Sequence, residues 1–100
     1  MLTVNKEIEG GKVTISLKGR LDINAVSQAE AELRPLLGKA TELIIDMKDL
    51  KFLATDAMRV LLSAQKQMNR QGRMRLINVG ETVLDNLETT GFVDIFYIAD

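Results

Sequence analysis

Residues 52–62 read FLATDAMRVLL, and this stretch decides the fold because it leads from a short apolar segment into the clearest helical pattern of the chain. Apolar side chains recur there at the spacing of one helix face: Ala57, Leu61, Ala64 and Met68. Polar side chains recur at the same spacing on the opposite face: Arg59, Ser63, Lys66 and Arg70. The pattern predicts an amphipathic helix packed against a sheet, ending at Gln71-Gly72.

The segments before this helix are typical of strands. Residues 2–8 and 13–17 alternate apolar and polar side chains, which predicts two half-buried strands. The paired glycines at positions 10 and 11 accept the positive φ of a tight turn, so the two strands form a hairpin. Leu43-Ile44-Ile45 lacks alternation, which favours a strand covered on both faces. Asp46 is expected to end that strand, Asp49 to lie in a turn, and Met47 to be buried.

Two further helices are expected. Residues 26–37 have a helical pattern that begins after Asn24 as N-cap, or at the alternative capping-box pair Ser27 and Glu30. Pro35 should kink or end this helix, and Gly38 is a natural stop. A short helix follows Gly80 and is closed by Gly91, with a strand on each side at residues 74–79 and 95–98.

The resulting order is ββαβαβαβ. It predicts one α/β domain over residues 1–100, with a mixed sheet: the hairpin is antiparallel and the later crossovers are parallel. A chain of 100 residues favours one domain, and no part of it resembles a linker or a repeat.

Composition excludes several kinds of chemistry. The chain has no cysteine and no histidine, so it lacks the thiolate nucleophile and the commonest general base and metal ligand. The net charge of −1 gives no reason to expect direct nucleic-acid binding. We therefore expect no enzyme, no cofactor and no metal site. No segment has the long apolar run of a signal peptide or a membrane span, so a cytoplasmic protein is the default expectation.

Thr55 and Asp56 lie where a strand passes into a helix, and two roles are open to the threonine. As an N-cap its oxygen would accept a backbone N–H bond, and residue types alone favour this role, for which Asp56 competes. As a phosphoacceptor it would place about two negative charges on the surface.

Several segments, taken in order, resemble the STAS domains of anti-sigma factor antagonists. They are Gly19-Arg20-Leu21-Asp22, residues 43–53 (LIIDMKDLKFL), residues 59–66 (RVLLSAQK), residues 76–79 (LINV) and residues 87–96 (LETTGFVDIF). The resemblance implies a regulator that binds an anti-sigma factor, often a serine/threonine kinase with the histidine-kinase ATPase fold, and thereby frees a sigma factor. In that scheme the kinase phosphorylates a hydroxyl at the start of the central helix, and the complex separates.

Carried over to this chain, the resemblance makes Thr55 the phosphorylated residue. It also implies a contact surface that comprises a loop at residues 49–54, Thr55, Asp56 and the exposed first turns of the helix. It places partner contacts at Asp22, Asp56, Ala57, Met58, Arg59 and Ser63. From its position alone, Asp22 is expected to serve helix entry.

The chain departs from the family pattern D-S-S-G-L or S-S-A-G-L, because residues 54–58 read ATDAM. Asp56 adds a permanent charge beside Thr55, and Ala57 adds a methyl group in place of glycine. Three outcomes fit: a working threonine switch, a permanently charged and weakly switchable domain, or a diverged domain with another partner. A different class of function, the accessory subunit that binds and regulates the ATPase of an ABC-type lipid transporter, would use the same helix face without phosphorylation. The oligomeric state is open.

Overall fold

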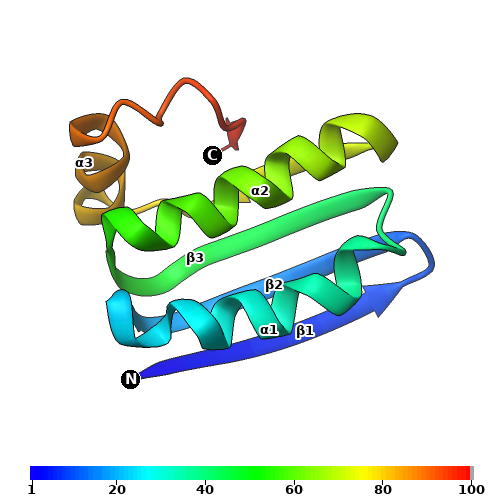
Figure 1. Cartoon of the computed structure of the whole chain (residues 1–100), viewed down its shortest axis with the longest axis horizontal. Helices are drawn as coiled ribbons and strands as arrows, with labels where there is room; N and C mark the ends of the chain where they lie inside the picture. Colours follow the sequence, from blue (N-terminus) through cyan, green and yellow to red (C-terminus); the bar gives the residue numbers. More distant parts are fainter. Residues whose placement is uncertain (100) are drawn as a thin grey trace.

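The computed structural model describes residues 1–99 as a five-stranded sheet with helices packed on it (Figure 1). The strands are β1 (Leu2–Glu9), β2 (Lys12–Leu21), β3 (Glu42–Leu53), β4 (Arg73–Ile77) and β5 (Ile98–Ala99). The helices are the 3-10 turn η1 (Ile23–Ala25), α1 (Val26–Leu37), α2 (Thr55–Gln71) and α3 (Glu81–Thr89). The predicted order of elements is therefore confirmed.

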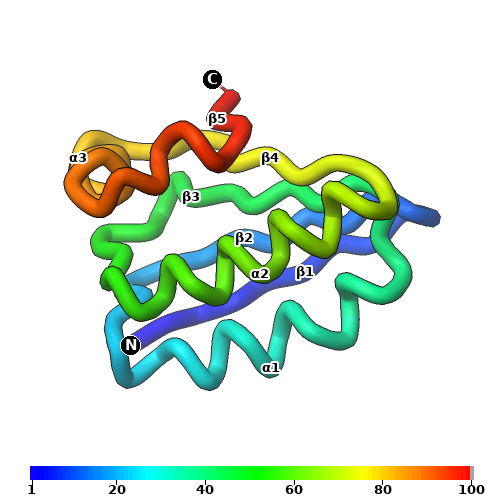
Figure 2. Tube along the Cα trace, turned by 45° about the horizontal axis from the view of Figure 1, so that its top comes forward, coloured from blue at the N-terminus to red at the C-terminus, as the bar shows by residue number. Residues whose placement is uncertain are grey.

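The strands lie in the sheet in sequence order, β1-β2-β3-β4-β5. β1 and β2 are antiparallel and the other neighbours are parallel, so the sheet is mixed, as predicted. α1 and α2 lie side by side on one face of the sheet, and α3 lies apart from them, beside the end at which β3 and β4 finish (Figure 2). As a result, the C-terminal ends of β2, β3 and β4 and the starts of the helices that follow them lie at one end of the molecule.

The core lies between the sheet and the α1–α2 layer. Val13, Ile15 and Leu17 of β2 are buried, whereas the residues that alternate with them are partly or fully exposed. The predicted stripe of α2 is fully buried, and so is Met47, as expected. In β3 the consecutive residues Leu43, Ile44 and Ile45 are all buried, so this strand is covered on both faces, as predicted. Burial of apolar side chains is the main stabilising contribution of such a layer.

β3 is longer than the sequence predicted, and the expectation of a loop at residues 49–54 is wrong. The strand continues through Asp46 and Asp49 to Leu53, and only Ala54 separates it from α2. Its register against β2 shifts twice, so that β3 carries extra residues relative to its neighbour. Each such bulge interrupts the alternation of side chains. The buried residues at this end therefore fall three apart, at Met47, Leu50 and Leu53, and the pattern no longer reads as a strand.

Smaller corrections concern element ends. Asn24 is not the cap of α1: Asp22 caps η1 by accepting a bond from the Asn24 N–H, and α1 follows without a side-chain cap. Pro35 lies inside α1, which ends two residues later, with Gly38 as its C-cap. The last strand starts at Ile98 rather than at residue 95, because residues 93–96 form turns. The hairpin turn is as expected, with Gly10 at φ 61°.

Candidate functional site at the start of helix α2

The backbone between β3 and α2 is held from two sides. The Ala54 N–H donates to the carbonyl of Leu21, at the end of β2, with an N···O distance of 2.9 Å. The Leu53 N–H donates to Oδ1 of Asn86, on α3, at 3.1 Å. Because a strand end and a helix side chain both fix this junction, the first turn of α2 has a defined position relative to the sheet.

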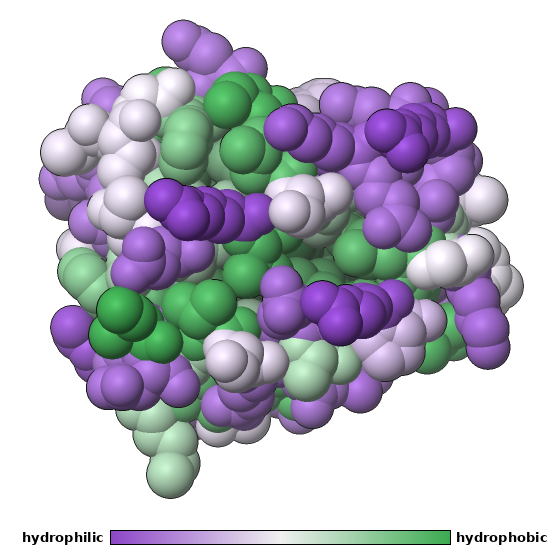
Figure 3. Space-filling model, in the orientation of Figure 1, coloured by the Kyte–Doolittle hydropathy of each residue, from purple (hydrophilic) through white to green (hydrophobic). Residues whose placement is uncertain are grey.

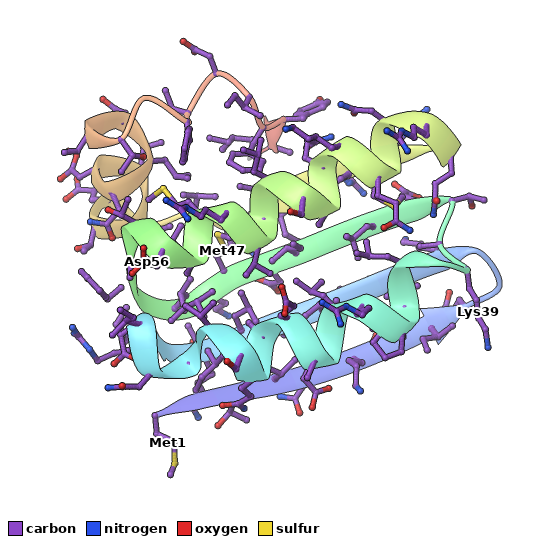
Figure 4. All side chains as sticks on the ribbon, viewed as in Figure 1. Met1, Lys39, Met47 and Asp56 are labelled. Carbon is purple, nitrogen blue, oxygen red and sulfur yellow. The ribbon has the colours of Figure 1, made fainter. Side chains whose placement is uncertain are left out.

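The first two side chains of α2, Thr55 and Asp56, make no bond to the helix start. Ala54, with φ −75° and ψ 154°, occupies the N-cap position, and no side chain bonds to the helix start. Thr55 and Asp56 are both exposed. The expectation that one of them caps the helix is therefore wrong. Figure 4 shows Asp56 on the first turn of α2, at the end of the molecule where the helices begin.

The environment of the Thr55 hydroxyl is electropositive on the backbone side. The first N–H groups of an α-helix have no partner within the helix, and together with the aligned peptide dipoles they carry a partial positive charge. Asp56, the acidic residue of this first turn, is favoured by the same field. A negatively charged group on Thr55 would thus be tolerated by the helix itself.

A groove runs beside this helix start, between α1 and α2. It has a volume of about 440 Å³. Its walls come from both helices and η1: Ile23, Val26, Ser27, Glu30, Asp56, Arg59, Val60 and Ser63. A smaller hollow of about 180 Å³ continues it along the two helices and shares Glu30, Val60 and Ser63. Figure 3 shows hydrophobic surface between the two helices, flanked by hydrophilic side chains. Such a surface can take up a protein segment that has both apolar and polar side chains.

The structure brings together some of the residues expected to contact a partner. Asp56, Arg59 and Ser63 are exposed and line the groove. Asp22 is half-buried at the entry to η1, where its Oδ1 accepts the Asn24 N–H at 3.1 Å, so the expected role in helix entry is confirmed.

The prediction is wrong for Ala57 and Met58, which have no exposed surface. The Ala57 side chain packs in the core, so its methyl group is not presented to a partner. Met58 Sδ instead accepts a bond from the Thr90 hydroxyl at 2.9 Å, and this contact joins the start of α2 to the residue that follows α3. Both residues therefore support the site from beneath.

The residues that the sequence did not reveal come from η1 and α1. Ile23 is 66% exposed, an unusual position for a large aliphatic side chain, and it forms one end of the groove. The sequence contained one indication. Ile23 is a large apolar residue that lies outside the apolar stripe of α1, whereas Val26 belongs to that stripe. Ser27 and Glu30 could not be assigned, because only the packing of α1 against α2 places them opposite Asp56 and Arg59.

Within residues 1–99, no three acidic side chains gather in a way that could hold a metal ion. The helices of this part of the chain are also too short or too polar to cross a membrane.

Comparisons with known proteins agree with this architecture. The family model described as STAS domain matches residues 3–100. The anti-sigma-B factor antagonist of Bacillus subtilis is 22% identical, over 98% of this chain and 93% of its own length. The Bordetella bronchiseptica protein BtrV is 28% identical, over 90% of this chain and 79% of its own.

Solved structures of similar proteins have the same fold. The anti-sigma factor antagonist SpoIIAA in its unphosphorylated form has a TM-score of 0.80 at 22% identity, covering 100% of this chain and 89% of that one. The phosphorylated form of SpoIIAA, from Bacillus, has a TM-score of 0.74 at 24% identity, covering 98% and 92%.

Proposed function

The chain belongs to the STAS domain family, and on that premise we propose that it is an anti-sigma factor antagonist controlled by phosphorylation of Thr55. One observation carries the proposal: Thr55 is exposed at the start of α2, has no capping role, and directly precedes Asp56, which lines a groove that a partner can occupy. Relatives named as anti-sigma factor antagonists support the general role.

The partner in this proposal is an anti-sigma factor of the serine/threonine-kinase type. It binds over Thr55, Asp56, Arg59 and Ser63 on α2 and over Ile23 on η1. The exposed apolar surface of Ile23 gives the interface a hydrophobic contact, and Arg59, which has no ion-pair partner among residues 1–99, gives it a charge to recognise.

Phosphorylation then works on the interface. The Thr55 oxygen attacks the γ-phosphorus of ATP held by the kinase, ADP leaves, and the hydroxyl proton passes to a base of the kinase. The product carries about two negative charges where the surface already has Asp56 and Glu30. Burying that charge against the partner costs desolvation energy, so the complex separates. Because the hydroxyl makes no bond that the fold needs, the domain stays folded.

The experiment is incubation with the anti-sigma factor kinase and ATP, followed by mapping of the modified residue by mass spectrometry. We expect phosphate on Thr55 and none on the Thr55→Ala variant. Thr82→Ala is a matched control, because Thr82 is also an exposed threonine in the first turn of a helix, α3. Label that persists in Thr55→Ala and disappears in Thr82→Ala would refute the assignment.

A charge substitution tests the switch itself. Thr55→Glu should weaken binding of the kinase at least tenfold, or about 1.4 kcal/mol, while the free energy of unfolding changes by less than about 0.5 kcal/mol. Thr82→Glu adds the same charge at another helix start and should leave binding unchanged. A transporter ATPase that binds the groove without phosphorylating the chain would instead favour the accessory-subunit function.

A further inference from the structure

The outer edge of β1 is the longest free strand edge of the sheet. β1 has eight residues, pairs with β2 without a register shift, and has no neighbour on its other side among residues 1–99 (Figure 1). An edge of this kind presents a row of unpaired N–H and C=O groups to any other strand. A second copy of the same chain offers an identical edge.

The hairpin determines which residues point their backbone groups outward. Glu9 and Lys12 flank a two-residue turn and so form a hydrogen-bonded pair, and the odd-numbered residues of β1 therefore bond to β2. The bond from the Arg20 N–H to the Met1 carbonyl agrees with this alternation. The outward groups belong to the even-numbered residues, whose side chains share the face that α1 covers: Leu2, Val4, Lys6 and Ile8. One of these groups is already bonded, because the Leu2 carbonyl accepts a bond from the Gln28 side-chain amide of α1 at 2.9 Å, so the unpaired part of the edge lies at Val4, Lys6 and Ile8.

Lys6 interrupts this otherwise apolar row. Its ammonium group forms an ion pair with Glu32 of α1 at 2.6 Å, and its side chain remains 40% exposed. The ion pair holds the positive charge of Lys6 near the middle of the β1 edge. Ile8, the next residue of the row, is 60% exposed and would gain burial from a paired strand.

Two antiparallel registers would pair seven residues of each β1. In one, Lys6 lies opposite Lys6 of the second copy. In the other, Lys6 lies opposite Val4 of the second copy, and the two ammonium groups are diagonal neighbours. Like charges at such positions destabilise a strand pair, and the row would otherwise be apolar.

We propose that Lys6, held by Glu32, prevents two copies of this chain from pairing through their β1 edges. If position 6 were uncharged, the row of Leu2, Val4 and Ile8 would allow the two β1 strands to pair. The sheets of the two copies would then be continuous. The β1 edge is thus a surface through which two copies could associate, and the charge of Lys6 prevents this association.

Size-exclusion chromatography with light scattering, over a range of concentrations, tests this proposal. The wild type should keep the molar mass of one chain, 11.1 kDa, while Lys6→Val should approach twice that value as concentration rises. Lys6→Thr also removes the charge but adds a less apolar side chain, so its molar mass should rise in the same direction by a smaller amount. Lys18→Val is the matched control, since Lys18 is an exposed lysine of β2 whose backbone has strands on both sides. It should remain a single chain.

A second substitution identifies the edge. Proline at position 8 removes an N–H that points outward and leaves the bonds between β1 and β2 intact. Lys6→Val combined with Ile8→Pro should therefore return to the mass of one chain, with circular dichroism confirming the fold. The proposal is overturned if folded Lys6→Val and Lys6→Thr stay single chains, if the double variant still dimerises, or if Lys18→Val dimerises equally.

Discussion

The two ends of helix α2 are held in different ways. At its last residue, the Gln71 amide donates to the carbonyls of Leu37 and Ala40, which belong to the end of α1 and the residues after it. The next N–H, of Gly72, donates to the Met68 carbonyl at 2.7 Å. At the first residues, Thr55 and Asp56, no side chain bonds to the helix start.

The surroundings of the two ends differ in the same sense. Near the last turn, the backbone of Thr41 accepts a bond from Arg73 at 3.1 Å and donates one to Gly11 at 2.8 Å, so the starts of β2, β3 and β4 are joined. Near the first turn, the backbone at residues 53–54 is held, but the next two side chains, Thr55 and Asp56, are exposed, and Asp56 lines the groove.

This difference separates stability from the proposed regulation. Contacts at the far end and beneath the first turn position α2, so the exposed groups at its start are not required for folding. A charged group can then be added to the helix start with little effect on the rest of the domain. The comparison predicts how strongly substitutions at exposed positions of α2 change the free energy of unfolding. The change should be largest at the end of the helix and smallest in its first turn.

Gly72→Ala should have the largest effect. A Cβ at this position would overlap the backbone carbonyl of Thr41, which cannot move without breaking its bond with Arg73. We expect a loss of about 3 kcal/mol in the free energy of unfolding, measured by urea denaturation. Gly38→Ala is the control: its Cβ would meet open space at φ −67°, so the change should be neutral or slightly stabilising. Equal losses at both glycines would contradict the steric explanation.

Gln71→Ala should have the second effect. It leaves the Leu37 and Ala40 carbonyls without the amide donor in a partly buried place, which costs about 2 kcal/mol. Gln67→Ala, an exposed glutamine one turn earlier on α2, should change the free energy of unfolding by less than about 0.5 kcal/mol. A Gln71→Ala variant as stable as Gln67→Ala would show that the two ends of α2 are not held differently.

The same contrast explains what the sequence could predict of the fold. α2 and its end at Gly72 follow from the apolar stripe, because burial on one face leaves a period of 3.6 in the sequence. The hydrogen bonds of Gln71 join residues 31 and 34 positions apart, and no local pattern encodes them. The continuation of β3 was not predicted for a related reason. The two bulges replace the alternation of buried and exposed residues by buried residues spaced three apart.

The candidate site was predictable in position but not in detail. The strand-to-helix junction marked Thr55, Arg59 and Ser63, and the structure places all three on the exposed side of α2. Residue types wrongly assigned a cap to Thr55 or Asp56, because the preference of threonine and aspartate for caps is statistical. Here the strand runs directly into the helix, and Ala54 takes the cap position.

Substitution of Asp56 should have the smallest effect and also shows which force acts at the helix start. If Asp56 acts only through its charge near the helix dipole, Asp56→Asn and Asp56→Ala should each lose about 0.5 kcal/mol at low salt, and less at high salt. If it were a cap, asparagine would preserve the cap, and alanine would cost about 1 kcal/mol at any salt concentration. Glu81→Gln, at the acidic first turn of α3, should reproduce the salt-dependent loss. Urea denaturation at two salt concentrations distinguishes these outcomes. A loss confined to Asp56→Ala would mean that the start of α2 is fixed by a side chain after all, like its end.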